Sequence, residues 1–139
     1  MLALAGRMLD VALASWSDYY TIKGVAQAFT VEVPGLDKPL IGEFDLVIQD
    51  GRDACIVDWK TSASRWPAGK ADRDLQATVF SYAYDKLNDA TPLFRFDVVT
   101  KAKSPVSESH YTSRGGDDFK RFEVLAVKDV TETIKTPRE

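Results

Sequence analysis

The sequence has very little of the chemistry that cysteine and histidine supply. Its 139 residues contain one cysteine, Cys55, and one histidine, His110. A lone cysteine excludes an intrachain disulfide and a four-cysteine zinc or iron–sulfur site, and a lone histidine excludes a multi-histidine metal site. This cysteine usage is typical of a reducing compartment, so we expect a cytoplasmic protein in which Cys55 is an inert buried thiol.

The sequence also lacks an excess of basic charge and a long apolar run. Its net charge is −3, so contact with nucleic acid would require a local basic patch or a metal ion. The apolar N-terminal stretch is interrupted by Arg7 and Asp10 and is too short to span a bilayer, so we expect no membrane association. Its spacing predicts an amphipathic helix over 1–16 that packs on the core through Leu9, Leu13, Trp16 and Tyr20.

The composition and pattern that remain predict a single α/β domain over 1–139. Apolar residues make up 45% and charged residues 28% of the chain, as in soluble globular proteins. Alternating β-branched and aromatic residues predict strands over 24–33, 40–49, 54–62 and 92–100. Helical spacing of apolar residues predicts helices over 72–87 and 118–135. Residues 101–117 are predicted to be mostly loop, with a short extended piece near 110–113.

Some side chains carry specific expectations. Asp72 is the predicted N-cap of the helix over 72–87, and the apolar stripe of that helix is predicted to be Leu75, Val79, Ala83 and Leu87. The ring of Trp59 is expected in the core, and Trp66 is expected to pack rather than to stack on a base. A basic group in the last third could follow phosphates or form a solvated face; it comprises Lys101, Lys103, Arg114, Lys120 and Arg121.

The stretch "IVDWKTS" raises the main functional question, because it places two charges in a strand that begins as a buried one. Charges there need partners or a ligand. If Gly51 and Arg52 form the tip of a tight turn, paired residue numbers sum to 103 and Asp45 lies opposite Asp58. Lys60 is two residues beyond Asp58, so it points to the same face. The turn therefore predicts a cluster of two carboxylates and one ammonium.

Two opposed carboxylates repel unless a cation lies between them. Mg²⁺ commonly takes one or two carboxylates, retains several waters and accepts substrate phosphate oxygens. Such an ion activates water and stabilises charge on a phosphoryl oxygen, while a nearby lysine can orient the water. The cluster of Asp45, Asp58 and Lys60 is therefore suited to metal-assisted hydrolysis of a phosphodiester.

With these residues, the sequence resembles the PD-(D/E)XK nuclease superfamily, and within it the RecB-like exonucleases. The resemblance rests on G-x-x-D (Gly42, Asp45), on "DWKTS" from Asp58, and on the helix opening "DLQATVFSYAY". It covers about residues 31–134. It implies a restriction-endonuclease-like fold, with a mixed central β-sheet flanked by α-helices, and a deoxyribonuclease that uses Mg²⁺ or Mn²⁺.

The resemblance also implies a role for each matching residue. Asp45 and Asp58 would bind the metal, and the backbone carbonyl of Trp59 would add a third oxygen. Lys60 would be the catalytic lysine, and Gln76 would support the site or the nucleic acid. The partner would be DNA, and the short chain favours a homo-oligomer or a larger nuclease complex acting in DNA repair or recombination. Only the resemblance favours an exonuclease over an endonuclease.

The sequence departs from the family pattern in two places. A tyrosine usually follows the motif glutamine after four residues, but Phe80 stands there, with Tyr82 and Tyr84 nearby. The early helix lacks the usual histidine or glutamate ligand, so Glu32 and Glu43 are considered as further carboxylates, with Glu43 on the same strand face as Asp45. These departures leave a second hypothesis, a non-catalytic nucleic-acid-binding or assembly module that retains the fold.

Overall fold

The structure is a computed structural model that describes residues 2–14 and 20–135, with side chains over 4–14 and 20–129. Its elements, in chain order, are α1 (Leu2–Ala14), β1 (Thr21–Val31), β2 (Leu40–Asp50), β3 (Asp53–Ser62), the 3₁₀ turn η1 (Ala71–Arg73), α2 (Leu75–Asn88), β4 (Leu93–Thr100), β5 (Ser107–Ser113) and α3 (Gly116–Lys135).

One mixed sheet organises the described part of the chain, with strand order β1-β2-β3-β4-β5. The β1–β2, β2–β3 and β4–β5 pairs are antiparallel, whereas β3 and β4 are parallel. Parallel neighbours need a crossover connection, and residues 63–92, including η1 and α2, provide it. The predicted fold class, a mixed central sheet flanked by helices, is confirmed.

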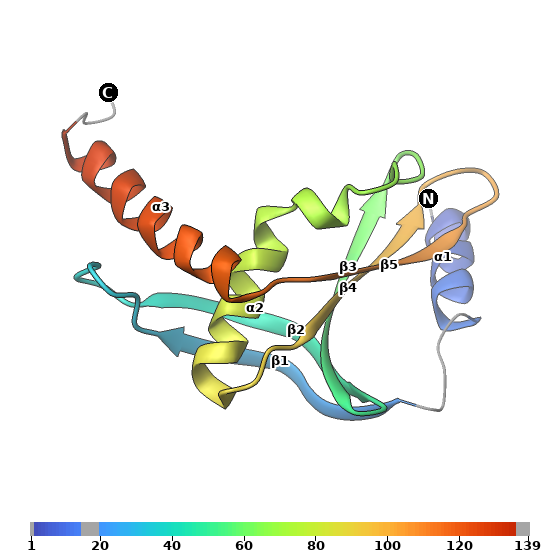
Figure 1. Ribbon diagram of the computed structural model, residues 1–139. Helices are drawn as coiled ribbons and strands as arrows, with labels where there is room; N and C mark the ends of the chain where they lie inside the picture. The colour runs from blue at the N-terminus through green and yellow to red at the C-terminus, as the bar shows by residue number, and fades with distance from the viewer. Residues whose placement is uncertain (1, 15–19, 136–139) are drawn as a thin grey trace.

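The main core lies between the sheet and α2, and α3 packs on α2 (Figure 1). Its aromatic centre joins four elements: Phe80 of α2 contacts Phe29 of β1, Phe44 of β2 and Phe94 of β4, with ring centroids 5.7, 5.9 and 6.3 Å away. Burying each such ring contributes roughly 1.5–3 kcal/mol. This contact fixes α2 above the strands that carry the predicted site residues.

A smaller core lies on the opposite face of the sheet. It contains Leu46, Ile48, Cys55 and Val57, all buried. Helix α1 contacts β4 and β5 and lies on the other side of the molecule from α3 (Figure 1). Burial raises the pKa of the Cys55 thiol to about 12, which agrees with the predicted inert, buried cysteine.

Several local predictions are corrected. Asp74, not Asp72, is the N-cap of α2, and its Oδ1 accepts a hydrogen bond from the backbone N of Gln76 at 2.8 Å. Asp72 lies in η1 and accepts from the hydroxyl of Thr112 at 2.7 Å. Residues 107–113 form the full strand β5 rather than a loop with a short extended piece.

The predicted apolar stripes are also partly wrong. Leu75 and Leu87 are 66% and 53% exposed; the buried side of α2 consists of Ala77, Ser81, Tyr82, Ala83 and Tyr84. In α1, Leu9 and Leu13 are exposed, so they do not provide the predicted packing face, and Trp16 lies outside the described residues. Over the described ranges, every helix is too short or too polar to cross a bilayer.

Candidate active site

The β2–β3 hairpin has the predicted register. Asp50 pairs with Asp53 across a two-residue turn in which Gly51 takes a left-handed φ of 64°, and the ladder continues to Leu46 opposite Val57. Every pair sums to 103. The next position in this register brings Asp45 to Asp58, and their side chains approach closely enough to share a hydrogen bond.

Asp58 is a buried carboxylate, with 4% of the residue exposed. Lys60 Nζ forms an ion pair with Asp58 Oδ2 at 3.0 Å, and this buried oxygen has no other hydrogen-bond partner among the described residues. Burial and the neighbouring Asp45 raise the pKa of Asp58 to about 6, against the opposing effect of Lys60. The ammonium therefore offsets only part of the cost of ionising Asp58.

Asp45 occupies an irregular place in β2. Phe44 packs on Tyr84 of α2 at 6.1 Å between ring centroids, and the next residue, Asp45, also reaches the α2 side through Asp58. Opposite them, Ala26 of β1 has a left-handed φ of 48° and interrupts the β1–β2 ladder. Two consecutive residues of β2 therefore face α2.

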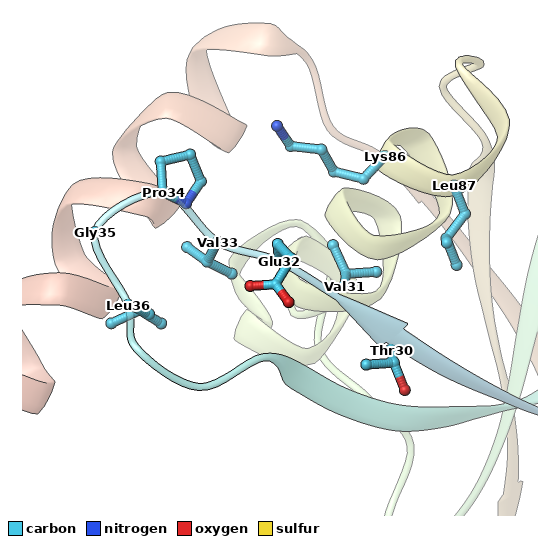
Figure 2. Close-up of a pocket in the computed structure, with 9 residues that line it drawn as sticks. All are labelled: Thr30, Val31, Glu32, Val33, Pro34, Gly35, Leu36, Lys86 and Leu87. Carbon is cyan, nitrogen blue, oxygen red and sulfur yellow. The ribbon is translucent and has the colours of Figure 1, made fainter.

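This irregularity corrects the prediction for Glu43. Because Phe44 and Gly42 face the core, where the Phe29 ring lies against Gly42, Glu43 between them points to the other face. It is exposed and does not share the face of Asp45. Glu32 follows the end of β1 and lines a cavity of about 580 Å³ near the end of α2 (Figure 2). Neither Asp45 nor Asp58 lines that cavity.

Trp59 is not a core residue, because 47% of its surface is exposed. It lies on the sheet face opposite Asp58, beyond the smaller core, and its position pairs with Asp97 of β4. The prediction that its ring packs in the core is wrong. The role of its carbonyl oxygen as a metal ligand stays a prediction.

Gln76 lies in the first turn of α2, partly buried. Its side-chain amide makes no hydrogen bond to another residue of the described ranges. Phe80 and Tyr84 follow it at intervals of four, so the three side chains share one helix face. Both aromatic rings pack on Phe44, the residue before Asp45. Phe80 and Tyr84 therefore lie beside the part of β2 that carries Asp45, and the supporting role of Gln76 stays a prediction.

Tyr82 and Tyr84, the two tyrosines near the position of the family tyrosine, point to different parts of the structure. Tyr82 faces α3, where its hydroxyl donates to Glu123 Oε2 at 2.7 Å. Tyr84 faces the sheet, and its hydroxyl accepts from Lys23 Nζ at 3.4 Å. Tyr84 is the tyrosine on the face of Gln76, and a count of two helical turns from Gln76 could have identified it.

Trp66 and His110 pack beside the candidate site. The Trp66 ring lies 5.0 Å from Phe96 and 5.6 Å from His110, and Phe96 is the β4 partner of Asp58. Lys70 Nζ lies 5.0 Å from the centre of the Trp66 ring. The tryptophan therefore has the predicted packing role. His110 lies in β5, with its Nε2 3.7 Å from Glu108 Oε2.

The basic group in the last third is divided by the structure. Arg114 is 7% exposed, and its guanidinium donates five hydrogen bonds, to Thr78, Thr112, Ser113, Ala71 and Asp74. Arg121 pairs with Asp118 at 2.7 Å. Arg114 is therefore committed to internal hydrogen bonds, whereas Arg121, Lys101, Lys103 and Lys120 are exposed.

The donor set suits a hard divalent cation. Within the described ranges, three or more His, Cys, Asp or Glu side chains do not gather at any one place, so the side-chain donors here are Asp45 and Asp58. The buried Asp58 Oδ2 without a hydrogen-bond partner and the raised pKa of its carboxyl indicate that negative charge is under-compensated. Mg²⁺ or Mn²⁺ fits this pair, because these ions need few protein oxygens and retain water.

Comparisons with known proteins agree with this geometry. The family model of the PD-(D/E)XK nuclease superfamily matches residues 2–135, so the chain belongs to this superfamily. A search of curated proteins gave no significant match.

Two solved structures share the fold. The first is described as a "Putative exonuclease" from Eubacterium rectale; it is 14% identical, with a TM-score of 0.68, and the alignment covers 96% of this chain and 52% of that one. The second, SSO0001, is 15% identical, with a TM-score of 0.59 and coverage of 99% and 62%. The chain thus spans about half to three fifths of their lengths, and the mixed sheet with its flanking helices is the nuclease fold.

Proposed function

We propose that the protein is a metal-dependent deoxyribonuclease that hydrolyses phosphodiester bonds, in the manner of the RecB-like exonucleases. The observation that carries this proposal is the cluster of Asp45, buried Asp58 and Lys60 on the α2 face of the sheet. A salt bridge alone would account for Asp58 and Lys60 but not for the second carboxylate. The superfamily membership supports hydrolysis of nucleic acid as the reaction class.

The cluster assigns a task to each residue. Asp45 and Asp58, with the Trp59 carbonyl, would hold Mg²⁺ or Mn²⁺, which when bound activates water and stabilises charge on phosphate oxygens. Lys60 is about one third exposed, so its ammonium can contact both Asp58 and an incoming phosphate. It orients the attacking water and stabilises the developing phosphoryl charge. Gln76 positions the strand from α2. No covalent protein intermediate is needed.

The exonuclease assignment and the size of the active assembly rest on similarity. The Eubacterium rectale structure carries an exonuclease description, and this chain spans 52% of it. We propose that 1–139 forms a single nuclease domain, which acts as a homo-oligomer or within a larger nuclease complex in DNA repair or recombination.

The decisive assay uses end-labelled linear DNA and closed circular DNA with Mg²⁺ or Mn²⁺. Lys60→Ala is the test variant, and Lys38→Ala, an exposed lysine in the β1–β2 connection, is the control. We expect metal-dependent loss of linear DNA, sparing of circles, and activity at least 10²-fold lower only in Lys60→Ala. Cleavage that persists in Lys60→Ala would contradict the proposal.

A non-catalytic nucleic-acid-binding or assembly module is the second candidate. Phe80 at the usual tyrosine position and the two-carboxylate donor set favour it. Thermal denaturation with and without Mg²⁺ or Mn²⁺ separates the two, because a cation that binds only the folded state raises the Tm. A Tm rise that disappears in Asp58→Asn supports the nuclease; a Tm indifferent to both ions supports the module.

A further inference from the structure

A second cavity, of about 320 Å³, lies next to the carboxylate pair. It is lined by Lys23, Gln27, Ala28, Phe44, Val47, Tyr84, Leu87 and Asn88. Phe44 and Val47 bracket Asp45 in β2, so the cavity opens on the same sheet face, one strand nearer the β1 edge. Adjacent strands lie about 4.8 Å apart, so β1 lies roughly 10 Å from β3 and Asp58. The cavity in Figure 2 is a different one, at the far end of β1.

The backbone of β1 is irregular where it lines this cavity. The register shifts between Ile22 and Gly24, which leaves Lys23 without a partner in the β1–β2 ladder, and Ala26 has a φ of 48°. A left-handed alanine costs roughly 1–2 kcal/mol. Gln27 folds over Gly24, where an added Cβ would lie 2.7 Å from its Oε1. Such strain is characteristic of functional sites, and here it groups Lys23 and Gln27 at one opening.

The polar groups of the cavity are mostly donors. Lys23 contributes an ammonium that lies 3.4 Å from the Tyr84 hydroxyl, and Gln27 contributes an amide. The side-chain amide of Asn88 donates to the backbone carbonyl of Tyr84 at 3.0 Å, and this hydrogen bond holds the Asn88 side chain at the rim of the cavity. An ammonium with neighbouring hydroxyl and amide donors suits phosphate oxygens. Among the residues that line the cavity, none carries a carboxylate.

We propose that this cavity binds a phosphate of the nucleic-acid strand, next to the phosphate that the carboxylate pair engages. This inference rests on the proposed nuclease function and adds Lys23 and Tyr84 to the substrate-binding residues. The Phe44 ring packs on the Tyr84 ring at 6.1 Å between centroids, which holds the Tyr84 hydroxyl beside Lys23. The negative charge of Asp45 and Asp58 opposes an anion here until a divalent cation neutralises it, so occupancy by phosphate depends on the metal.

The test measures oligonucleotide binding by fluorescence anisotropy in Mg²⁺, in a Lys60→Ala background that prevents cleavage. Lys23→Met removes the cation, and Tyr84→Phe removes only the hydroxyl while keeping the ring. Lys86→Met is the matched control, because Lys86 lies on α2, as Tyr84 does, but does not line this cavity. Its Nζ lies 3.7 Å from Glu123 Oε2 instead. Circular dichroism establishes that each variant is folded.

We expect Lys23→Met to weaken binding of all sequences and to lower the slope of log K against log salt concentration by about 0.7, the value for one phosphate of a single strand. Tyr84→Phe weakens binding less. Lys86→Met leaves the slope unchanged. A Lys23→Met variant that behaves like Lys86→Met would overturn the site.

Oligonucleotides with and without a terminal phosphate, and inorganic phosphate as competitor, identify which phosphate is bound. An effect of Lys23→Met confined to phosphorylated ends places a strand terminus in the cavity, and an equal effect on both places an internal phosphate there. If the wild type cleaves DNA but Lys23→Met leaves the salt slope unaltered, the phosphate site in the cavity is refuted and the nuclease proposal is not. If oligonucleotide binding depends on Lys23 but the wild type cleaves no DNA, the nuclease proposal is refuted and the phosphate site is not. If the wild type binds no oligonucleotide, both proposals are refuted.

Discussion

Replacing Asp58 by asparagine should stabilise the metal-free protein while abolishing the proposed nuclease activity. The carboxyl is buried beside Asp45, and its pKa is raised from 3.8 to about 6 in the folded state. A raised pKa for an acid means that the folded state holds the proton more tightly than the unfolded state does. Ionising Asp58 therefore does not destabilise the fold below about pH 3.8. The loss of stability grows between pH 3.8 and 6, and it continues toward its full value above pH 6.

The magnitude follows from the two pKa values. At 1.36 kcal/mol per pKa unit, ionised Asp58 costs the metal-free fold about 3 kcal/mol at pH 8. Asparagine has a similar shape and no charge, so most of this cost disappears. Lys60 loses its partner, but its side chain is 36% exposed and can be solvated. The gap between variant and wild type should close as the pH falls to 4.

The assay is urea denaturation in EDTA between pH 4 and pH 8, repeated with Mg²⁺. Metal at one hundred times its Kd adds about 2.7 kcal/mol to wild type and nothing to Asp58→Asn, so the advantage of the variant is largely lost in metal. Asp53→Asn, an exposed position on the same strand, is the control and should show neither effect. A variant less stable than wild type at pH 8 in EDTA, or a gap independent of pH, would refute the reasoning.

Three further predictions concern the scaffold. Asp97→Asn should cost about 3 kcal/mol in urea denaturation, because Asp97 Oδ1 lies 2.8 Å from buried Arg95 Nε and removing it leaves a desolvated cation; a loss below 1 kcal/mol would contradict this. Gly42→Ala should lower stability by about 1–3 kcal/mol, since its Cβ would lie 2.5 Å from Phe29 Cζ, and an unchanged Tm would argue against the contact. Cys55, buried with its pKa raised to about 12, should react with a thiol reagent only on unfolding; rapid labelling of the folded protein would show otherwise.

The hairpin could be predicted because its geometry is local. A two-residue turn at Gly51 fixes the register of both strands, and extending that register by one position beyond Leu46 and Val57 brings Asp45 to Asp58, which interact in the structure. Trp59 could not be placed in the same way. The smaller core on its face of the sheet ends at Val57, so Trp59 is left 47% exposed, and the sequence of β3 alone does not specify where that core ends.

Strand β5 and helix α2 show the same dependence on distant partners. The sequence of β5, Ser107–Ser113, is mostly polar and lacks the alternation of a half-buried strand; it pairs because the edge of β4 offers free backbone groups. In α2, the buried side includes Ser81, Tyr82 and Tyr84 because α3 covers one flank of the helix and the sheet the other. The predicted stripe of aliphatic residues therefore identified the helix and the buried Ala83, but it missed the other buried residues of α2.

The side chains of β2 do not alternate strictly between the two faces of the sheet at Asp45, and the candidate site depends on this irregularity. With regular alternation, Phe44 and Asp45 would point to opposite faces, and β2 could supply either the ring that packs on Tyr84 or the carboxylate that meets Asp58. The left-handed Ala26 on the neighbouring strand accompanies the break, so both side chains reach the α2 face. The same distortion of β1 gathers Lys23 and Gln27 at the adjacent cavity. One strained edge strand thus serves the core, the carboxylate pair and the proposed phosphate site together.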